Sequence, residues 1–213
     1  MQVGILGSGL MGGTLGTLLA RAGHRVVFAY ARDEQKLERL ANEAGANARA
    51  GTPVEAARDS DALVVAVHWS RLDDVLSQAG NVARKVIVSC SLPMNAANTE
   101  LVVAHTSSGA EELAKRVRGA PVVSAFNTVP SEVLFPVFEA RSRGPRPSLV
   151  YCGDDSAAKA VAAQLIGDAG FAPVDAGPLR IARVTEPFAL LVAELAYGGG
   201  DPALAYRFER FGG

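Results

Sequence analysis

A glycine-rich turn near the start of the chain limits the possible folds more than any other feature. Residues 7–12 read Gly-Ser-Gly-Leu-Met-Gly and lie between the apolar run 2–6 and a segment whose apolar residues recur at helical spacing. Gly7 allows a tight turn, Gly9 lets backbone N–H groups approach a phosphate, and Gly12 permits close packing of helix on strand. This pattern in this setting predicts a dinucleotide site.

Apolar runs alternate with helical patterns along most of the chain. Strands are expected at residues 2–6, 25–30, 46–50, 61–67, 85–90, 121–126, 148–153 and 172–177. Unbroken apolar runs such as 61–67 are typical of strands buried on both faces of a parallel sheet. The alternation predicts an α/β fold, a Rossmann-like doubly wound parallel sheet with a short C-terminal α/β and helical extension. We expect one dinucleotide-binding domain over residues 1–213.

The tip of the second strand indicates which dinucleotide is bound. An acidic residue at this tip would bind the ribose diol of NAD, but the sequence there is Tyr30, Ala31 and Arg32. Arg32 can pair with a 2′-phosphate, and Lys36 and the Ser8 hydroxyl could reach the same group, which favours NADP. In the alternative, Arg32 is a solvated loop residue and Asp33 holds the ribose, although Asp33 fits better as a helix N-cap.

Composition excludes several other classes. The net charge of −1 gives no reason to expect nucleic acid or a membrane surface as a partner. Cys90 and Cys152 are far apart, fit no metal spacing, and are expected to be small buried residues. The sequence begins without a signal-peptide pattern and has no apolar run long enough to span a bilayer, so we expect a cytoplasmic protein.

The expected strand ends carry little acid–base chemistry. They read His-Trp-Ser at 68–70, Ser-Leu-Pro-Met at 91–94 and Phe-Asn-Thr-Val-Pro at 126–130. No general-base dyad is among them, and His68 fits a packing or capping role beside Trp69 as well as a catalytic one. Hydride exchange between two redox cofactors needs alignment rather than proton abstraction, so we expect no obligatory catalytic residue. Asn127, Thr128 and His68 are the possible contributors to rate.

Three longer stretches carry a family resemblance. Residues 122–134 (VVSAFNTVPSEVL), 152–166 (CGDDSAAKAVAAQLI) and 175–187 (DAGPLRIARVTEP) resemble the NADPH-dependent F420 reductase family and its bacterial relatives. The first stretch is also similar to the reductase domain of the six-transmembrane metalloreductases, which passes hydride from NADPH to a flavin. The resemblance implies NADP and a second redox cofactor, F420 or FMN/FAD, with residues 178–213 covering the second-cofactor cleft. It also implies a homodimer.

The resemblance also assigns site residues by position. The archaeal members carry a histidine where Asn127 stands, whereas the flavin-using relatives resemble this sequence, so the second cofactor stays open between F420 and a flavin. The pyrophosphate side would be Gly7, Ser8, Gly9, Leu10, Met11 and Gly12; the 2′-phosphate site Tyr30, Arg32 and Lys36; and the nicotinamide pocket Val67, His68, Trp69, Leu92, Ala125 and Asn127.

Two other function classes and one structural question stay open. A different NADP enzyme, such as a hydroxyacid dehydrogenase or imine reductase, would need a long helical second domain, and few residues follow Gly177. An NADP-binding sensor would bind without turnover. The apolar helix expected at 186–197 could pack over the sheet or form a dimer contact. At its start, Arg183 and Glu186 are expected to pair locally.

Overall fold

The computed structural model describes residues 1–31 and 33–212, except for the side chain of Glu34. Its strands join in one sheet in the order β3-β2-β1-β4-β5-β6-β7-β8. β1 to β6 pair in parallel, and the switch in strand order lies between β1 and β4. The strands are β1 Gln2–Leu6, β2 Arg25–Ala29, β3 Ala48–Ala50, β4 Ala62–Val65, β5 Val86–Ser89, β6 Val122–Ser124, β7 Ser148–Gly153 and β8 Ala172–Asp175.

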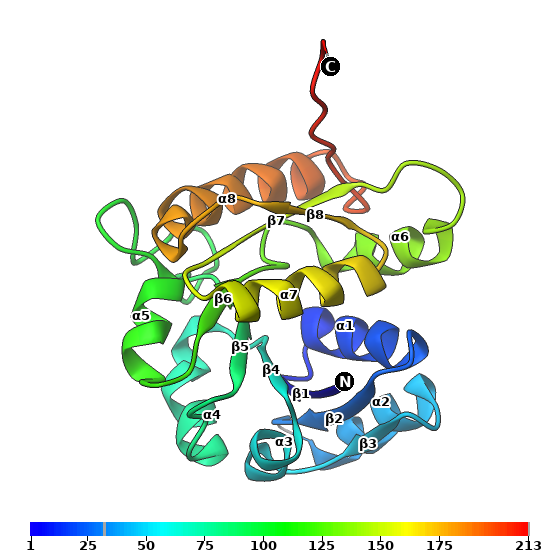
Figure 1. Ribbon diagram of the computed structural model, residues 1–213, viewed down its shortest axis with the longest axis vertical. Helices are drawn as coiled ribbons and strands as arrows, with labels where there is room; N and C mark the ends of the chain where they lie inside the picture. Colours follow the sequence, from blue (N-terminus) through cyan, green and yellow to red (C-terminus); the bar gives the residue numbers. More distant parts are fainter. Residues whose placement is uncertain (32, 213) are drawn as a thin grey trace.

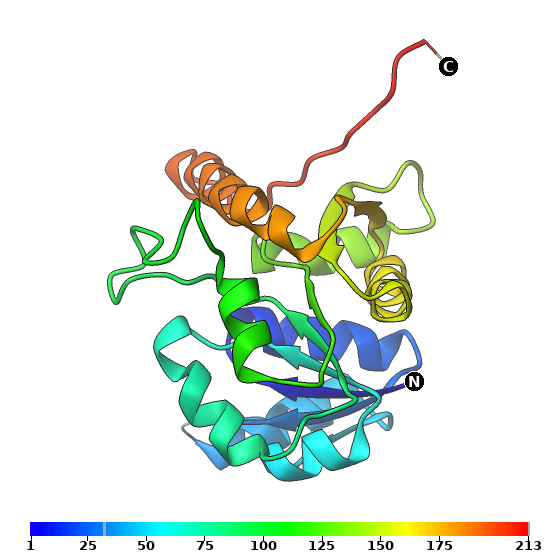
Figure 2. The same ribbon diagram turned by 60° about the vertical axis from the view of Figure 1, so that its left-hand side comes forward.

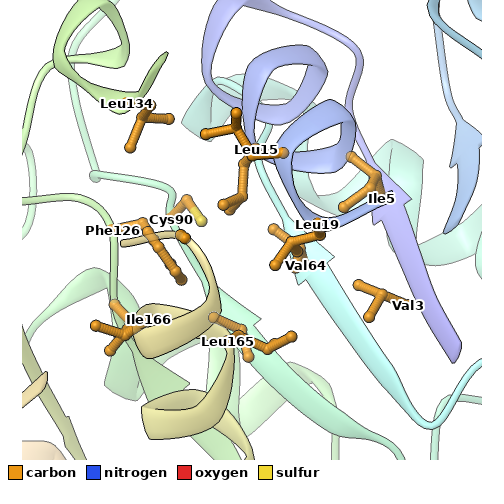
Figure 3. Packing of buried hydrophobic residues seen from close by; sticks show 14 of the residues in the cluster. Val3, Ile5, Leu15, Leu19, Val64, Cys90, Phe126, Leu134, Leu165 and Ile166 are labelled. Carbon is orange, nitrogen blue, oxygen red and sulfur yellow. The ribbon is translucent and has the colours of Figure 1, made fainter. Parts of the chain in front are cut away.

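Helices cover both faces of the sheet (Figure 1). One apolar cluster joins one face to α1, α2, α6 and α7, and a second joins the other face to α3, α4 and α5. Figure 3 shows Leu15 and Leu19 of α1 and Leu165 of α7 in the first cluster. The helices are α1 Leu10–Arg21, α2 Glu34–Ala44, α3 Pro53–Asp59, α4 Leu72–Ala79, α5 Gly109–Arg116, α6 Leu134–Ala140, α7 Ser156–Asp168 and α8 Ala182–Gly198, with short 3₁₀ turns η1 Trp69–Arg71, η2 Ser131–Val133 and η3 Leu179–Ile181.

The elements begin and end where local chemistry directs. Thr52 and Glu55 form a capping box at the start of α3, with Pro53 in its first turn. The Asp33 side chain accepts a hydrogen bond from Gln35 N at the start of α2, and Gly45 follows its last residue with φ +99°. Asp33 is therefore the N-cap that the sequence predicts.

The far edge of the sheet departs from a fully parallel arrangement. β7 runs antiparallel to β6, pairing Ser124 with Cys152, and β8 is parallel to β7. The strand–helix–strand unit β7–α7–β8 thus forms as predicted but is added to the sheet in reverse. The C-terminal helix α8 begins at Ala182, four residues before the expected start, and Pro187 is accommodated inside it.

The expected local pair between Arg183 and Glu186 is wrong. Arg183 instead forms a double hydrogen bond to the Glu111 carboxylate on α5, at 2.8 and 2.6 Å. Glu186 accepts hydrogen bonds from Gly109 N at 2.8 Å and Ala110 N at 2.9 Å. The N-terminus of α5 offers unpaired backbone donors, and these bind a buried carboxylate better than a neighbouring side chain does. Both residues therefore join α8 to α5.

Over the part of the chain that the structure describes, none of the helices combines the length and apolar character that crossing a membrane requires.

Candidate functional site

The glycine turn has the geometry of an anion-binding site. Gly7 has φ +116°, a conformation that favours glycine, and a methyl group at Gly12 would lie 1.9 Å from the Gly7 carbonyl oxygen. Gly9 is exposed, and a methyl group there would meet no protein atom within 4 Å. The first two constraints are internal, whereas the space over Gly9 is open for a ligand that approaches the backbone.

The start of α1 is left free for a negative charge. Its N-cap, Gly9, supplies no side-chain hydrogen bond, and the first turn of α1 contains no acidic residue. Such a helix end presents unpaired N–H groups and a partial positive charge, which suits a pyrophosphate. Leu10, which follows Gly9, is 75% exposed.

Ser8 and Tyr30 hold the turn against the tip of β2. The Ser8 backbone N–H and hydroxyl both donate to the Tyr30 carbonyl oxygen, at 3.3 and 3.1 Å. Tyr30 itself has φ +67°, an uncommon conformation for a residue other than glycine. The Ser8 hydroxyl, expected to reach a 2′-phosphate, is buried and instead donates to the Tyr30 carbonyl oxygen.

An open pocket of about 1040 Å³ adjoins the turn. It brings together seven of the predicted residues: Gly7, Ser8, Gly9, Tyr30, Lys36, Val67 and His68. Arg32, central to the prediction of NADP, lies outside the described residues. The pocket is further lined by Ala31, Asp33, Leu37, Glu38, Ala50, Gly51, Thr52, Pro53, Ala66, Arg71, Asp74 and Gln78.

The second wall of this pocket comes from η1 and α4, which sequence reasoning missed. The Tyr30 hydroxyl donates to Asp74 at 2.5 Å, and Gln78 donates to the same carboxylate at 3.2 Å. The Tyr30 hydrogen bond, followed by that of Gln78, holds the pKa of Asp74 below its usual value. Arg71 lines the same side. No sequence motif marks these residues, because their place depends on how the start of α4 meets Tyr30 after β2.

The carboxyl ends of β4 and β5 lie side by side in the sheet, and the residues after β4 line the pocket. Val67 follows β4, and its carbonyl oxygen accepts a hydrogen bond from the Ser91 hydroxyl at 2.7 Å. Leu92, which follows Ser91 in sequence, is half-buried. Trp69 does not line the pocket, and its ring lies under the Arg116 guanidinium at 5.4 Å.

His68 caps η1, the structural role that the sequence allows. Its Nδ1 accepts a hydrogen bond from Ser70 N at 3.2 Å. Nε2 lies 3.3 Å from the Asn95 carbonyl oxygen, to which it donates in the tautomer that this cap requires. With both ring nitrogens engaged, His68 joins β4 to the loop after β5.

The turn after β6 is buried and strained. Phe126 is fully buried with φ +65°, and Ala125 before it is fully buried as well. Asn127 is 9% exposed and donates to the Ser124 hydroxyl at 3.1 Å. Thr128 is 1% exposed and lies 2.8 Å from the Tyr206 hydroxyl. Non-glycine residues in this conformation cluster at functional sites, where packing holds them in place.

Cys90 and Cys152 are both buried and free, as predicted. Burial raises the pKa of each thiol to about 12. Neither sulfur is therefore a ready nucleophile.

Comparison with known proteins relates the part of the chain that contains this site to a family. The family described as "NADP oxidoreductase coenzyme F420-dependent" matches residues 2–93, which include the glycine turn and the pocket. The metalloreductase STEAP3 of Rattus norvegicus is 30% identical over 189 residues, 89% of this chain. Over residues 2–93 the chain is therefore similar to the F420-dependent NADP oxidoreductases. The description of that family agrees with the class that the sequence predicts, an NADP-dependent oxidoreductase.

This chain covers different shares of the length of each relative. It spans 36% of the length of STEAP3. A candidate F420-dependent NADP-reductase from Arthrobacter sp. FB24 superposes with a TM-score of 0.85 at 23% identity, over 98% of this chain and 99% of that one. A reductive aminase from Aspergillus terreus, solved with NADPH and ethyl levulinate, superposes with a TM-score of 0.67 at 18% identity, over 93% of this chain and 62% of that one. The two superpositions establish the shared fold.

Proposed function

We propose that this protein transfers a hydride between NADPH and a second redox cofactor, either F420 or a flavin. The observation that carries the proposal is the open space over Gly9, next to an uncapped helix N-terminus and a large pocket. NADPH supplies the hydride chemistry when it is bound, and the protein supplies position and exclusion of water. The family and the Arthrobacter protein support F420, and STEAP3 supports a reductase.

The pocket beside the turn suits the adenosine half of NADP. A dinucleotide lies across the switch in strand order, with its pyrophosphate at the first turn. The side of the pocket next to β2 and β3 then receives the adenosine. Lys36 lines the pocket on this side, and Arg32 comes shortly after β2 in the sequence. Lys36 would bind the 2′-phosphate through its ammonium group. Asp33 is committed to capping α2, which makes it a poorer ribose ligand.

The other half of the dinucleotide would lie over the ends of β4, β5 and β6. Val67, Leu92 and Asn127 are the predicted residues that follow these strands. The chemistry between two cofactors needs no general base, so the engaged ring of His68 is compatible with it. We further propose that residues 178–213 cover the cleft for the second cofactor.

We also propose a homodimer formed through α8. Val184, Leu191 and Leu195 lie along one side of this helix and are 65%, 54% and 61% exposed. An exposed apolar stripe of this kind is typical of a surface that another molecule covers.

The function is tested by anaerobic NADPH oxidation with F420, FMN, FAD or no acceptor. We expect fast turnover with one class of acceptor and a higher Kd for NADPH in an Arg32→Ala variant. Turnover with F420 alone would show that Asn127 is compatible with the deazaflavin, and turnover with FMN or FAD would assign a flavin. Binding of NADPH without reduction of any acceptor would contradict the enzymatic proposal and favour a sensor.

A further inference from the structure

The segment after α8 returns to the sheet at Tyr206. The Tyr206 carbonyl oxygen accepts a hydrogen bond from Ser148 N at 2.8 Å, and Phe208 N donates to the Ser148 hydroxyl at 2.9 Å. The Tyr206 ring packs against Phe188 of α8 and against Phe208, with centroids 5.1 and 5.4 Å apart. The C-terminal end of the chain then extends away from the body of the protein (Figure 2). Residue 206 is therefore an anchor of the tail.

The Tyr206 hydroxyl reaches further, to the buried turn after β6. It lies 2.8 Å from Thr128 Oγ1 and accepts a hydrogen bond from Val150 N at 3.3 Å. Burial raises the pKa of Tyr206, so the hydroxyl keeps its proton and can bond both groups. One tail side chain thus connects β7 with the turn that follows β6.

The missing partner of Val150 explains why a tail residue is needed. β6 and β7 pair up to Ser124 and Cys152, and the same register continued would place Phe126 opposite Val150. The positive φ of Phe126 turns the backbone out of the strand, so the ladder stops. The Tyr206 hydroxyl then takes the Val150 N–H in place of the neighbouring strand.

The turn that Tyr206 supports lies on the nicotinamide side of the proposed site. The adenosine pocket lies beside β2 and β3, so the other end of the dinucleotide must extend over β4 to β6. The turn 126–128 follows β6 directly, and its strained backbone keeps its form only while its surroundings hold it.

We propose that Tyr206 is a positioning residue for the nicotinamide end of the cofactor, because its hydroxyl fixes the turn 126–128 from behind. The inference rests on the proposed function and deepens it. No group of Tyr206 takes part in bond making, and its effect is transmitted through Thr128 and the backbone of Phe126.

The test compares two ligands on a Tyr206→Phe variant, which keeps the ring and removes the hydroxyl. NADPH reaches the nicotinamide end, whereas adenosine 2′,5′-bisphosphate occupies only the adenosine half. We expect the Kd for NADPH to rise roughly three- to tenfold, as for the loss of one hydrogen bond. The Kd for the bisphosphate should stay within about twofold, since its contacts lie on the other side of the switch point.

Tyr197→Phe is the matched control, because its hydroxyl bonds Glu132 on an exposed surface at 3.1 Å. It should leave both Kd values unchanged. If Tyr206→Phe does not fold, Thr128→Val removes the partner hydroxyl and must give the same ratio of the two Kd values.

Three results would overturn the inference. Equal changes in both Kd values would show that Tyr206 only stabilises the fold, and no change in either would show that it does not position the turn. A wild-type protein that binds neither ligand would overturn the proposed function and this inference together. Binding of both ligands by the wild type, with only the NADPH Kd changed in the variant, supports the inference.

Discussion

Gly9 and Gly12 lie three residues apart, and a methyl group would meet different surroundings at each. At Gly12 it would overlap the Gly7 carbonyl oxygen, whereas at Gly9 it would enter open space. Their joint appearance in a sequence motif predicts the turn but does not separate the two roles. The structure assigns Gly12 to folding and leaves Gly9 free for a ligand.

Alanine at these two positions should therefore give opposite results. Gly9→Ala should unfold at the wild-type urea midpoint but raise the Kd for NADPH at least tenfold, because the added methyl group occupies the approach to the backbone. Gly12→Ala should lower the free energy of unfolding by about 1–3 kcal/mol through steric overlap. Urea unfolding and NADPH titration of each variant check this. Unchanged NADPH affinity in Gly9→Ala would remove the pyrophosphate from this turn.

Lys36 provides a test of cofactor selectivity within the described residues. It is exposed and lines the pocket, so one charge-assisted bond to a 2′-phosphate should be worth about 1 kcal/mol. Lys36→Ala should then raise the Kd for NADPH about fivefold and leave that for NADH unchanged. Lys115→Ala, at an exposed lysine paired with Glu112, is the control. An equal loss for both nucleotides would mean that Lys36 does not recognise the 2′-phosphate.

At the scale of elements, α5 and α8 are joined by a buried carboxylate. Glu186 is 1% exposed and caps α5 through Gly109 N and Ala110 N. Burial raises the pKa of Glu186 from 4.5 to about 7. The hydrogen bonds from Gly109 N and Ala110 N act in the opposite direction and lower the pKa, but burial has the larger effect. The neighbouring Glu111 carboxylate adds to the increase, although Arg183 is bonded to it.

This pKa predicts a pH-dependent contribution to stability. Between pH 4.5 and about 7 the folded protein holds a proton on Glu186 that the unfolded chain releases. The free energy of unfolding should therefore fall as pH rises through this range, by up to about 3 kcal/mol, and the contribution is complete only below pH 4.5. Urea unfolding at several pH values between 4.5 and 8, for wild type and Glu186→Gln, measures it.

The Gln variant should lack this slope because it has no proton to release. The free energy of unfolding of the wild type minus that of the variant should therefore fall as pH rises. If this difference stays constant across the range, Glu186 does not titrate there. If it rises with pH, the pKa of Glu186 is lowered in the folded protein rather than raised.

Local rules account for what could be predicted of these elements from the sequence. The caps Asp33 and Thr52 act on backbone atoms two or three residues away, so the sequence pattern is sufficient. Glu186 acts 77 residues away in sequence on Gly109, and Tyr206 acts 78 away on Thr128. Such contacts depend on how the chain returns after β8, which no local pattern encodes. For the same reason, the sequence analysis did not predict that Asp74 lines the pocket.

At the scale of the whole molecule, the alternation of strands and helices was enough to predict the doubly wound, mostly parallel sheet. The reversal of β7 was not predictable, because a buried strand has the same apolar pattern in either direction. Only part of the predicted site lines the pocket. Gly7, Ser8 and Gly9 come together with Tyr30 and Lys36 in one pocket. The predicted residues outside its lining are Leu10, Met11, Gly12, Trp69, Leu92, Ala125 and Asn127.

The proposed dimer predicts a defined effect of charge on α8. Leu191→Glu places a carboxylate in the apolar stripe and should shift the molar mass in solution from two chains to one, measured by light scattering after size exclusion. Val54→Glu changes a residue of equal exposure, 54%, on α3 and should leave the mass unchanged. A monomeric wild type, or a Leu191→Glu protein of unchanged mass, would contradict the dimer.

The most direct test of the central claim is single-turnover reduction of the accepting cofactor, F420 or a flavin, under anaerobic conditions. NADPH carrying deuterium at one or the other C4 position would be mixed with the protein and the acceptor. Direct hydride transfer predicts that NADPH oxidation and acceptor reduction occur at one rate, slowed severalfold by deuterium at only one of the two positions. NADPH that binds but stays reduced, or a rate indifferent to deuterium at both positions, would contradict the account.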